Sequence, residues 1–144
     1  MLRISTDKAE LAVPLTHGFL TNSYWARGIP LEIVARAIKH SLCFGGFVGP
    51  AQVAFARVVT DYATFANLLD VFVLPEHRGR GHGTALMQAV FSHPQLQGLR
   101  RFTLATADAH GLYARFGFTA PAATQSLMER YVPDIYQKAD SLHT

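Results

Sequence analysis

The residues best suited to chemistry lie in a glycine-rich turn, Arg78-Gly79-Arg80-Gly81-His82-Gly83-Thr84, which follows a β-branched and aromatic run ending at Pro75. An apolar segment with helical spacing comes next, so the turn should open a helix. The first N–H groups of a helix lack internal partners, and the helix dipole adds about half a positive charge there. Glycines let an anion reach the backbone, and Arg78 and Arg80 add donors suited to phosphate. The turn therefore predicts a phosphate-binding site.

Two common phosphate-binding motifs do not fit this turn. A Walker A loop ends in Gly-Lys-Ser/Thr, whereas this turn ends in Gly83-Thr84 without a lysine. The dinucleotide fingerprint G-x-G-x-x-G/A fails from Gly79, where its last position is Thr84, and from Gly81, where it is Leu86. The sequence therefore disfavours a nucleotide triphosphatase and a nicotinamide-dependent enzyme.

The segments around the turn have either helical or strand periodicity. Predicted helices cover Glu10–Leu20, the segment from Pro30 to His40, the segment from the turn to His93-Pro94, and Ala109–Phe116. Predicted strands cover Leu2–Ile4, Leu42–Val48, Gln52–Thr60, Phe65–Leu74, Arg101–Thr106 and, at the end, Phe118 with Leu127–Tyr131. The order β-α-α-β-β-β-α-β-α-β predicts an α+β fold with a mixed sheet and helices on its faces.

Composition limits the class of protein. A length of 144 residues matches a single domain, 1–144, and 49% hydrophobic with 16% charged residues excludes an intrinsically disordered chain. With one cysteine, Cys43, and no metal-binding spacing among the histidines, we expect no disulfide and no metal. The net charge is +3 and the arginines are spread along the chain. This pattern suits an anionic small ligand, and we expect no nucleic-acid partner.

The ends of the chain and its apolar runs predict location and assembly. The first ten residues contain no apolar signal-like run, and the apolar runs are interrupted before the roughly 18 residues that a membrane span needs. We therefore expect a cytoplasmic protein with no membrane partner. Low charged content and the long region Ala120–Thr144 favour a homodimer.

Two motifs and the element order resemble one family. The turn, read as Arg78-x-x-Gly81-x-Gly83, resembles the acetyl-CoA signature R/Q-x-x-G-x-G/A of the GNAT superfamily of N-acetyltransferases. Downstream, Tyr113-Ala114-Arg115-Phe116-Gly117-Phe118 is similar to the family's Tyr-x-x-x-Gly-Phe ending of the last helix. His82 departs from the family, which usually has an aliphatic or small residue at that position. The resemblance covers nearly the whole chain and implies a GNAT-like fold with a splayed central sheet.

The resemblance implies residues for the cofactor and for catalysis. Acetyl-CoA would bind with its pyrophosphate on Arg78–Thr84 and its pantetheine arm on backbone groups of Phe72, Val73 and Leu74, where one N–H would polarise the thioester carbonyl. Tyr113 would be the general acid that protonates the departing thiolate. Asp70 is the candidate general base; its alternatives are backbone solvation and a structural pairing with an arginine.

The resemblance also implies an acceptor pocket and an activity. Tyr24, Trp25 and Arg27 lie between the first two predicted helices, where they would wall the acceptor pocket or, alternatively, cover the sheet. Few acids lie in the central region, so we expect a small monoamine with an apolar part and a carboxylate rather than a polyamine. The implied reaction moves an acetyl group from acetyl-CoA to a primary amine in a ternary complex. The alternative is a non-catalytic CoA-binding sensor or interaction module.

Overall fold

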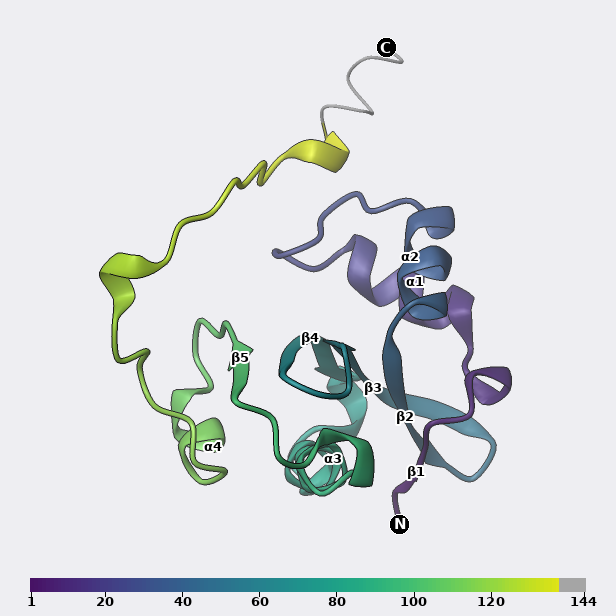
Figure 1. Cartoon of the computed structure of the whole chain (residues 1–144). Helices are drawn as coiled ribbons and strands as arrows, with labels where there is room; N and C mark the ends of the chain where they lie inside the picture. The colour runs from purple at the N-terminus through teal and green to yellow at the C-terminus, as the bar shows by residue number, and fades with distance from the viewer. Residues whose placement is uncertain (138–144) are drawn as a thin grey trace.

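The strands form a mixed sheet in the order β1-β2-β3-β4-β5 in a computed structural model that describes residues 1–137 (Figure 1). The last seven residues of the domain predicted over 1–144 lie outside the described residues. The strands are β1 (Arg3–Ser5), β2 (Leu42–Val48), β3 (Ala51–Thr60), β4 (Phe65–Val73) and β5 (Arg101–Leu104). Neighbours are antiparallel except β4 and β5, which are parallel because a helix connects them. The predicted α+β class is confirmed.

Helices lie on both faces of the sheet. They are α1 (Val13–Thr21), α2 (Leu31–Lys39), α3 (His82–Phe91) and α4 (His110–Ala114). Because side chains alternate along a strand, Cys43 and Phe55 pack with α1 and α2, while Phe44 and Ala54 pack with α3 (Figure 1). Two apolar clusters, one on each face, therefore hold the sheet between the helices.

The predicted helix over Glu10–Leu20 begins later than expected, at Val13. Pro14 lies in the first turn of α1, where its missing N–H costs no helical hydrogen bond. Pro30 is the N-cap of α2 rather than a residue of its first turn. The two prolines thereby bracket the loop that carries Tyr24, Trp25 and Arg27.

Strand β5 pairs with only the first part of β4. Their pairing runs from Phe65 opposite Arg101 to Leu68 opposite Leu104 and stops there. The second half of β4, from Leu69 to Val73, continues without a β5 partner. The sheet is therefore splayed as predicted, and one edge of β4 stays open just before the glycine-rich turn.

A bulge interrupts the pairing of β3 with β4 beside this opening. Phe55 pairs with Phe72 and Arg57 pairs with Leu69, so one more residue lies on β4 than on β3. Asp70 is in this segment and has φ +58, a left-handed conformation that Asp tolerates better than most residues. Bulges re-aim side chains, and this one directs the Asp70 carboxylate toward Arg57.

The C-terminal segment differs from the prediction. No strand follows α4 within residues 1–137, so the final strand predicted at Phe118 and Leu127–Tyr131 is absent there. Residues 119–137, the C-terminal arm, instead run around the outside of the molecule from α4 to the side of α1 and α2 (Figure 1). Near the end of the arm, Tyr136 contacts the loop before α2. Its Cβ lies 3.5 Å from the position that a Cβ on Gly28 would occupy. A strand forms only where it pairs with another strand, and no strand within residues 1–137 pairs with the C-terminal arm.

Candidate functional site

The glycine-rich turn begins α3 directly. Gly81 is the N-cap with φ +79, Gly79 has φ +78, and no side chain caps the helix. The N–H groups of the first turn are therefore available to a ligand. A Cβ atom on Gly79, Gly81 or Gly83 would meet no atom of residues 1–137 within 4 Å.

Neither backbone conformation nor close packing within residues 1–137 requires glycine at position 83. It lies inside α3, where glycine costs about 1 kcal/mol relative to alanine, and the space above it is open. By contrast, positive φ explains Gly79 and Gly81. An open, uncapped helix start with a bare residue in its first turn matches the predicted phosphate site.

Other polar residues of the turn surround this helix start. The Arg78 Nε donates to the Val73 carbonyl at 2.9 Å, which ties the turn back to β4. Arg80 is exposed and forms no ion pair within residues 1–137. His82 and Thr84 are half-buried residues of the first turn of α3. The structure therefore brings all the predicted turn residues to one end of α3.

The backbone of β4 presents alternate residues to its open edge. The Leu74 N–H donates to the Val53 carbonyl at 2.8 Å, so Leu74 and, by alternation, Phe72 direct their backbone groups toward β3. Val73 directs its own groups the other way, toward the open edge. Val71, two residues earlier, also directs its backbone groups toward the open edge. The sequence analysis did not single out Val71, because this orientation follows only from the register of β4 against β3.

Asp70 lies in a cluster of charged and polar side chains at the bulge. Its Oδ2 accepts a hydrogen bond from Arg57 Nε at 2.8 Å, and its Oδ1 accepts one from Trp25 Nε1 at 3.0 Å. The Arg57 and Asp70 side chains are only 16% and 11% exposed. The pairing with an arginine, which the sequence left open, is confirmed, and both carboxylate oxygens are engaged.

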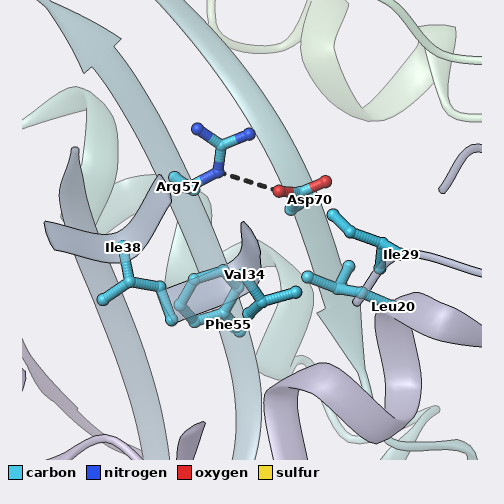
Figure 2. A pocket seen from close by; sticks show the side chains of 7 residues that line it. All are labelled: Leu20, Ile29, Val34, Ile38, Phe55, Arg57 and Asp70. Atoms are coloured by element: carbon cyan, nitrogen blue, oxygen red, sulfur yellow. Dashed lines mark hydrogen bonds and ion pairs between the residues drawn. The ribbon is translucent and has the colours of Figure 1, made fainter. Parts of the chain in front are cut away.

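The sequence did not single out Arg57, although a lone basic residue in the apolar run of β3 was a usable signal. Its Nη1 also donates to Ser41 Oγ at 3.1 Å. Figure 2 shows the ion pair above apolar side chains. These residues line a cavity of about 10 Å³, enough for about one water: Leu20, Ile29, Val34, Ile38, Phe55, Arg57 and Asp70. The cavity is therefore too small for any molecule much larger than water.

The loop between α1 and α2 lies over β4 through aromatic contacts. Phe19 stacks on Phe72 with ring centroids 4.0 Å apart, and its ring lies 6.2 Å from that of Trp25. Tyr24 is exposed and packs edge-on against Trp25 at 5.1 Å. Arg27 is exposed and forms no ion pair within residues 1–137. The structure thus joins Trp25 to Asp70 and leaves Tyr24 and Arg27 accessible.

Tyr113 lies on α4 in the apolar cluster of the α3 face. It is 7% exposed, and Val73 packs against the same cluster. Burial, with a smaller contribution from the negative charge of Asp108, raises the pKa of the Tyr113 phenol. Its hydroxyl has no hydrogen-bond partner in residues 1–137. The phenol therefore stays protonated and available as a donor.

Cys43 is a buried thiol and not a nucleophile in this state. It is 1% exposed, and burial raises its pKa to about 11. Among residues 1–137, no three His, Cys, Asp or Glu side chains are grouped so that they could share a metal ion. Of the helices in that range, none combines the length and apolar character needed to cross a bilayer.

Comparisons with known proteins agree with this geometry. The model of the acetyltransferase (GNAT) domain matches residues 39–120. A candidate acetyltransferase of Gibberella zeae is 33% identical over 135 residues, covering 78% of this chain and 75% of that protein.

Solved structures match over almost the whole chain. A candidate acetyltransferase of the GNAT family from Xanthomonas campestris pv. campestris is 66% identical with a TM-score of 0.93, covering 94% of this chain and 96% of that chain. A Clostridium acetobutylicum protein solved with acetyl-CoA has a TM-score of 0.63 at 14% identity, covering 91% and 96% of the two chains, and so shares the fold. The family match spans β2 to α4 and includes both the glycine-rich turn and Tyr113. The chain therefore belongs to the GNAT family and is an acetyltransferase.

Proposed function

We propose that the chain, as one domain over 1–144, transfers the acetyl group of acetyl-CoA to the primary amine of a small molecule by direct attack in a ternary complex. The observation that carries this proposal is the open edge of β4, from Leu69 to Val73, which ends beside the uncapped start of α3. CoA has an amide-containing arm that can pair with a strand edge and a pyrophosphate suited to a helix start. The Clostridium acetobutylicum protein of the same fold, solved with acetyl-CoA, supports the choice of donor.

The donor is bound by backbone and arginine groups. The N–H groups at the start of α3, with Arg78 and Arg80, bind the pyrophosphate, while His82 and Thr84 add side-chain donors. The glycines at 79, 81 and 83 keep the backbone uncovered. The pantetheine arm binds along Phe72–Leu74, chiefly through Val73, because that residue directs its backbone groups to the open edge.

Acetyl transfer exchanges a C–S bond for a C–N bond. The neutral amine attacks the thioester carbonyl carbon, and a backbone N–H on the open edge of β4 stabilises the oxyanion. The C–S bond then breaks, the Tyr113 hydroxyl protonates the departing thiolate, and a proton from solvent restores the phenol. Its burial supports this role, because a raised pKa keeps the phenol protonated.

Asp70 acts on the acceptor side, either as the general base or by holding Trp25 in place. Its two engaged oxygens favour the positioning role, in which water takes the ammonium proton. Asp70→Asn and Trp25→Phe distinguish the roles. If Asp70 is the base, Asp70→Asn lowers kcat and Trp25→Phe leaves kcat unchanged. If Asp70 positions Trp25, both variants raise KM for the acceptor by a similar factor.

The acceptor binds beside the loop of Tyr24, Trp25 and Arg27. The exposed aromatic faces and the Arg27 guanidinium, which forms no ion pair within residues 1–137, suit a monoamine with an apolar part and a carboxylate.

A screen of amines tests the proposed activity through free-thiol release from acetyl-CoA. We expect thiol and N-acetyl product in equal amounts with at least one carboxylated monoamine. If calorimetry detects acetyl-CoA binding but no amine is acetylated, the proposed reaction is contradicted and the proposed acetyl-CoA site stands. Absence of binding would contradict both.

The proposed setting is the cytoplasm, with a homodimer as the working form and no nucleic-acid or membrane partner. The dispersed arginines support the absence of a nucleic-acid partner, and the exposed apolar arm supports a dimer. Cell fractionation and measurement of mass in solution test these points.

A further inference from the structure

The sheet face that carries α1 and α2 is only partly covered by those helices. Their apolar cluster reaches Phe55 on β3 and its partner Phe72 on β4. Two rows further along the strands, the register places Val59 of β3, Asn67 of β4 and Thr103 of β5 beside one another on the same face. Val59 is 41% exposed, and the other two residues are half-buried. This row, Val59-Asn67-Thr103, is therefore accessible within residues 1–137.

Asn67 has a hydrogen-bond donor without a good partner. Thr103 Oγ1 donates to Asn67 Oδ1 at 2.6 Å, which engages the acceptor half of the amide. Among residues 1–137, the amide Nδ2 reaches only the carbonyl of Leu68, at 3.5 Å, which is beyond the usual range of N–H···O bonds. Asparagine is also depleted in strands, where β-branched residues fit better. The fold gives no reason for an amide at this position, whereas a ligand oxygen would.

The charges around the row favour an anionic group. Arg101 lies two residues before Thr103 on β5 and so shares its face; it is exposed and forms no ion pair within residues 1–137. The acid on the adjoining part of β4 is Asp70, and Arg57 and Trp25 engage both of its oxygens. A carboxylate can accept from the free amide N–H near a guanidinium, whereas an ammonium group, which is a donor only, would meet another donor and a like charge.

The row lies next to the proposed site of acetyl transfer. The pairing of β4 with β5 ends at Leu68, and the open edge on which the thioester is proposed to lie begins at Leu69, two residues beyond Asn67. A strand rises about 3.3 Å per residue, so the separation is at least about 7 Å. An α-amino acid carries its amine and its carboxylate on one carbon and cannot span this separation. An ω-amino acid holds the two groups far enough apart.

We propose that Asn67 selects an acceptor whose carboxylate is separated from its amine by a chain or a ring, as in an ω-amino acid. Its Nδ2 donates to a carboxylate oxygen, and Thr103 is a positioning residue that holds the amide through Oδ1. A carboxylate has two oxygens and about four lone-pair sites, so Arg27 can bind the same group from the loop. This inference rests on the proposed acetyl transfer and adds the strand residue that chooses the acceptor.

A series of unbranched amino acids tests the spacing. Glycine, β-alanine, γ-aminobutyrate and δ-aminovalerate are compared at saturating acetyl-CoA. We expect kcat/KM to be at least about 10-fold higher for γ-aminobutyrate or δ-aminovalerate than for glycine, the effect of one hydrogen bond to a charged group. Butylamine, which has the chain of γ-aminobutyrate without its carboxylate, is the reference for the acid group.

Substitution of Asn67 tests the donor. Asn67→Asp keeps the shape of the side chain and replaces the donor by a negative oxygen, while Asn67→Ala removes the donor without adding charge. Both should raise KM for γ-aminobutyrate at least about 10-fold and leave KM for butylamine and the affinity for acetyl-CoA unchanged. The matched control is Asn22→Asp, at the chain's other asparagine, the C-cap of α1. It adds the same charge and should keep the natural KM, and circular dichroism should show all variants folded.

Substitution of Thr103 tests the positioning role. Thr103→Val keeps the shape and removes the hydroxyl that holds Asn67, so KM for γ-aminobutyrate should rise while kcat stays natural. Thr103→Ser keeps the hydroxyl and should restore the natural KM. If Thr103 only supported the fold, its loss would affect γ-aminobutyrate and butylamine equally, and that result would exclude the positioning role.

The outcomes separate this selection from the reaction itself. Acetylation that Asn67→Asp and Asn67→Ala leave unchanged, or lower equally for γ-aminobutyrate and butylamine, would overturn the role of Asn67 and keep acetyl transfer. A kcat/KM that is highest for glycine would overturn the spacing and also keep acetyl transfer. Acetyl-CoA binding without acetylation of any amine would contradict the reaction and this selection together.

Discussion

Trp25 and Asp70 lie 45 residues apart in the chain, yet the indole Nε1 donates to the Asp70 Oδ1 at 3.0 Å. One hydrogen bond thus joins the loop between α1 and α2 to the bulge in β4. Because Arg57 holds the other carboxylate oxygen, the bulge fixes the loop over the open end of the sheet. The loop proposed to bind the acceptor is therefore held by Asp70, a residue of the same strand, β4, that is proposed to bind acetyl-CoA.

Loss of Arg57 should destabilise the fold strongly. Arg57→Met leaves a largely buried Asp70 carboxylate without its cation, and breaking such a pair costs about 3–5 kcal/mol. The double variant Arg57→Met/Asp70→Leu removes both charges and should recover most of that loss. Urea unfolding measures the free energy of unfolding, and an equal loss in the single and double variants would contradict a pairing in which each charge compensates the other.

Gly83→Glu should abolish binding of acetyl-CoA. The substitution places a side chain and a negative charge in the open space over the start of α3, where the pyrophosphate is proposed to bind. Gly18→Glu in α1 is the matched control, because Gly18 is also a helical glycine and no atom in the described part of the chain lies within 4 Å of an added Cβ. Calorimetry should find no heat of binding for Gly83→Glu and natural affinity for the control; equal affinity in both would remove α3 from the donor site.

Tyr113→Phe should lower turnover by about 10²–10⁴-fold while leaving acetyl-CoA affinity nearly unchanged. The variant keeps the buried ring and removes the proton donor. Steady-state rates at saturating acceptor, beside calorimetry with acetyl-CoA, separate the two effects. Natural turnover in this variant would exclude Tyr113 as the acid.

The raised pKa of Tyr113 also predicts a loss of stability at high pH. The folded phenol stays protonated at pH values where the unfolded one, with a pKa of about 10, has ionised. Unfolding then releases a proton, so this contribution to stability is complete below about pH 10 and declines as the pH rises toward the folded value. Thermal unfolding between pH 8 and 11 should show a steeper decline for the natural chain than for Tyr113→Phe, and parallel curves would contradict the shift.

Arg27→Ala should raise KM for a carboxylated monoamine and leave acetyl-CoA binding alone. The guanidinium is exposed and unpaired within residues 1–137, so its removal costs the acceptor a partner without disturbing the fold. Arg36→Ala, an exposed arginine on α2, is the control and should keep the natural KM. Efficient acetylation of spermidine, with none of amino-acid amines, would show that the pocket has a different specificity.

The sequence by itself determined the parts of this protein that are local in the chain. The glycine-rich turn, its helix and the strand before it are consecutive residues, so spacing and backbone preference were enough to predict an anion-binding helix start. The order of helices and strands up to α4 was likewise readable, because periodicity follows from which face each residue buries.

Only the tertiary structure decided the contacts that depend on register and on partners. The bulge at Asp70 results from how β4 pairs with β3, and it selects Arg57 and Trp25 as the partners of that carboxylate and Val73 as the residue facing the open edge. The predicted final strand failed for a related reason: Leu127–Tyr131 has the composition of a strand, but a strand forms only where another edge satisfies its backbone hydrogen bonds, and residues 1–137 provide no such pairing for it.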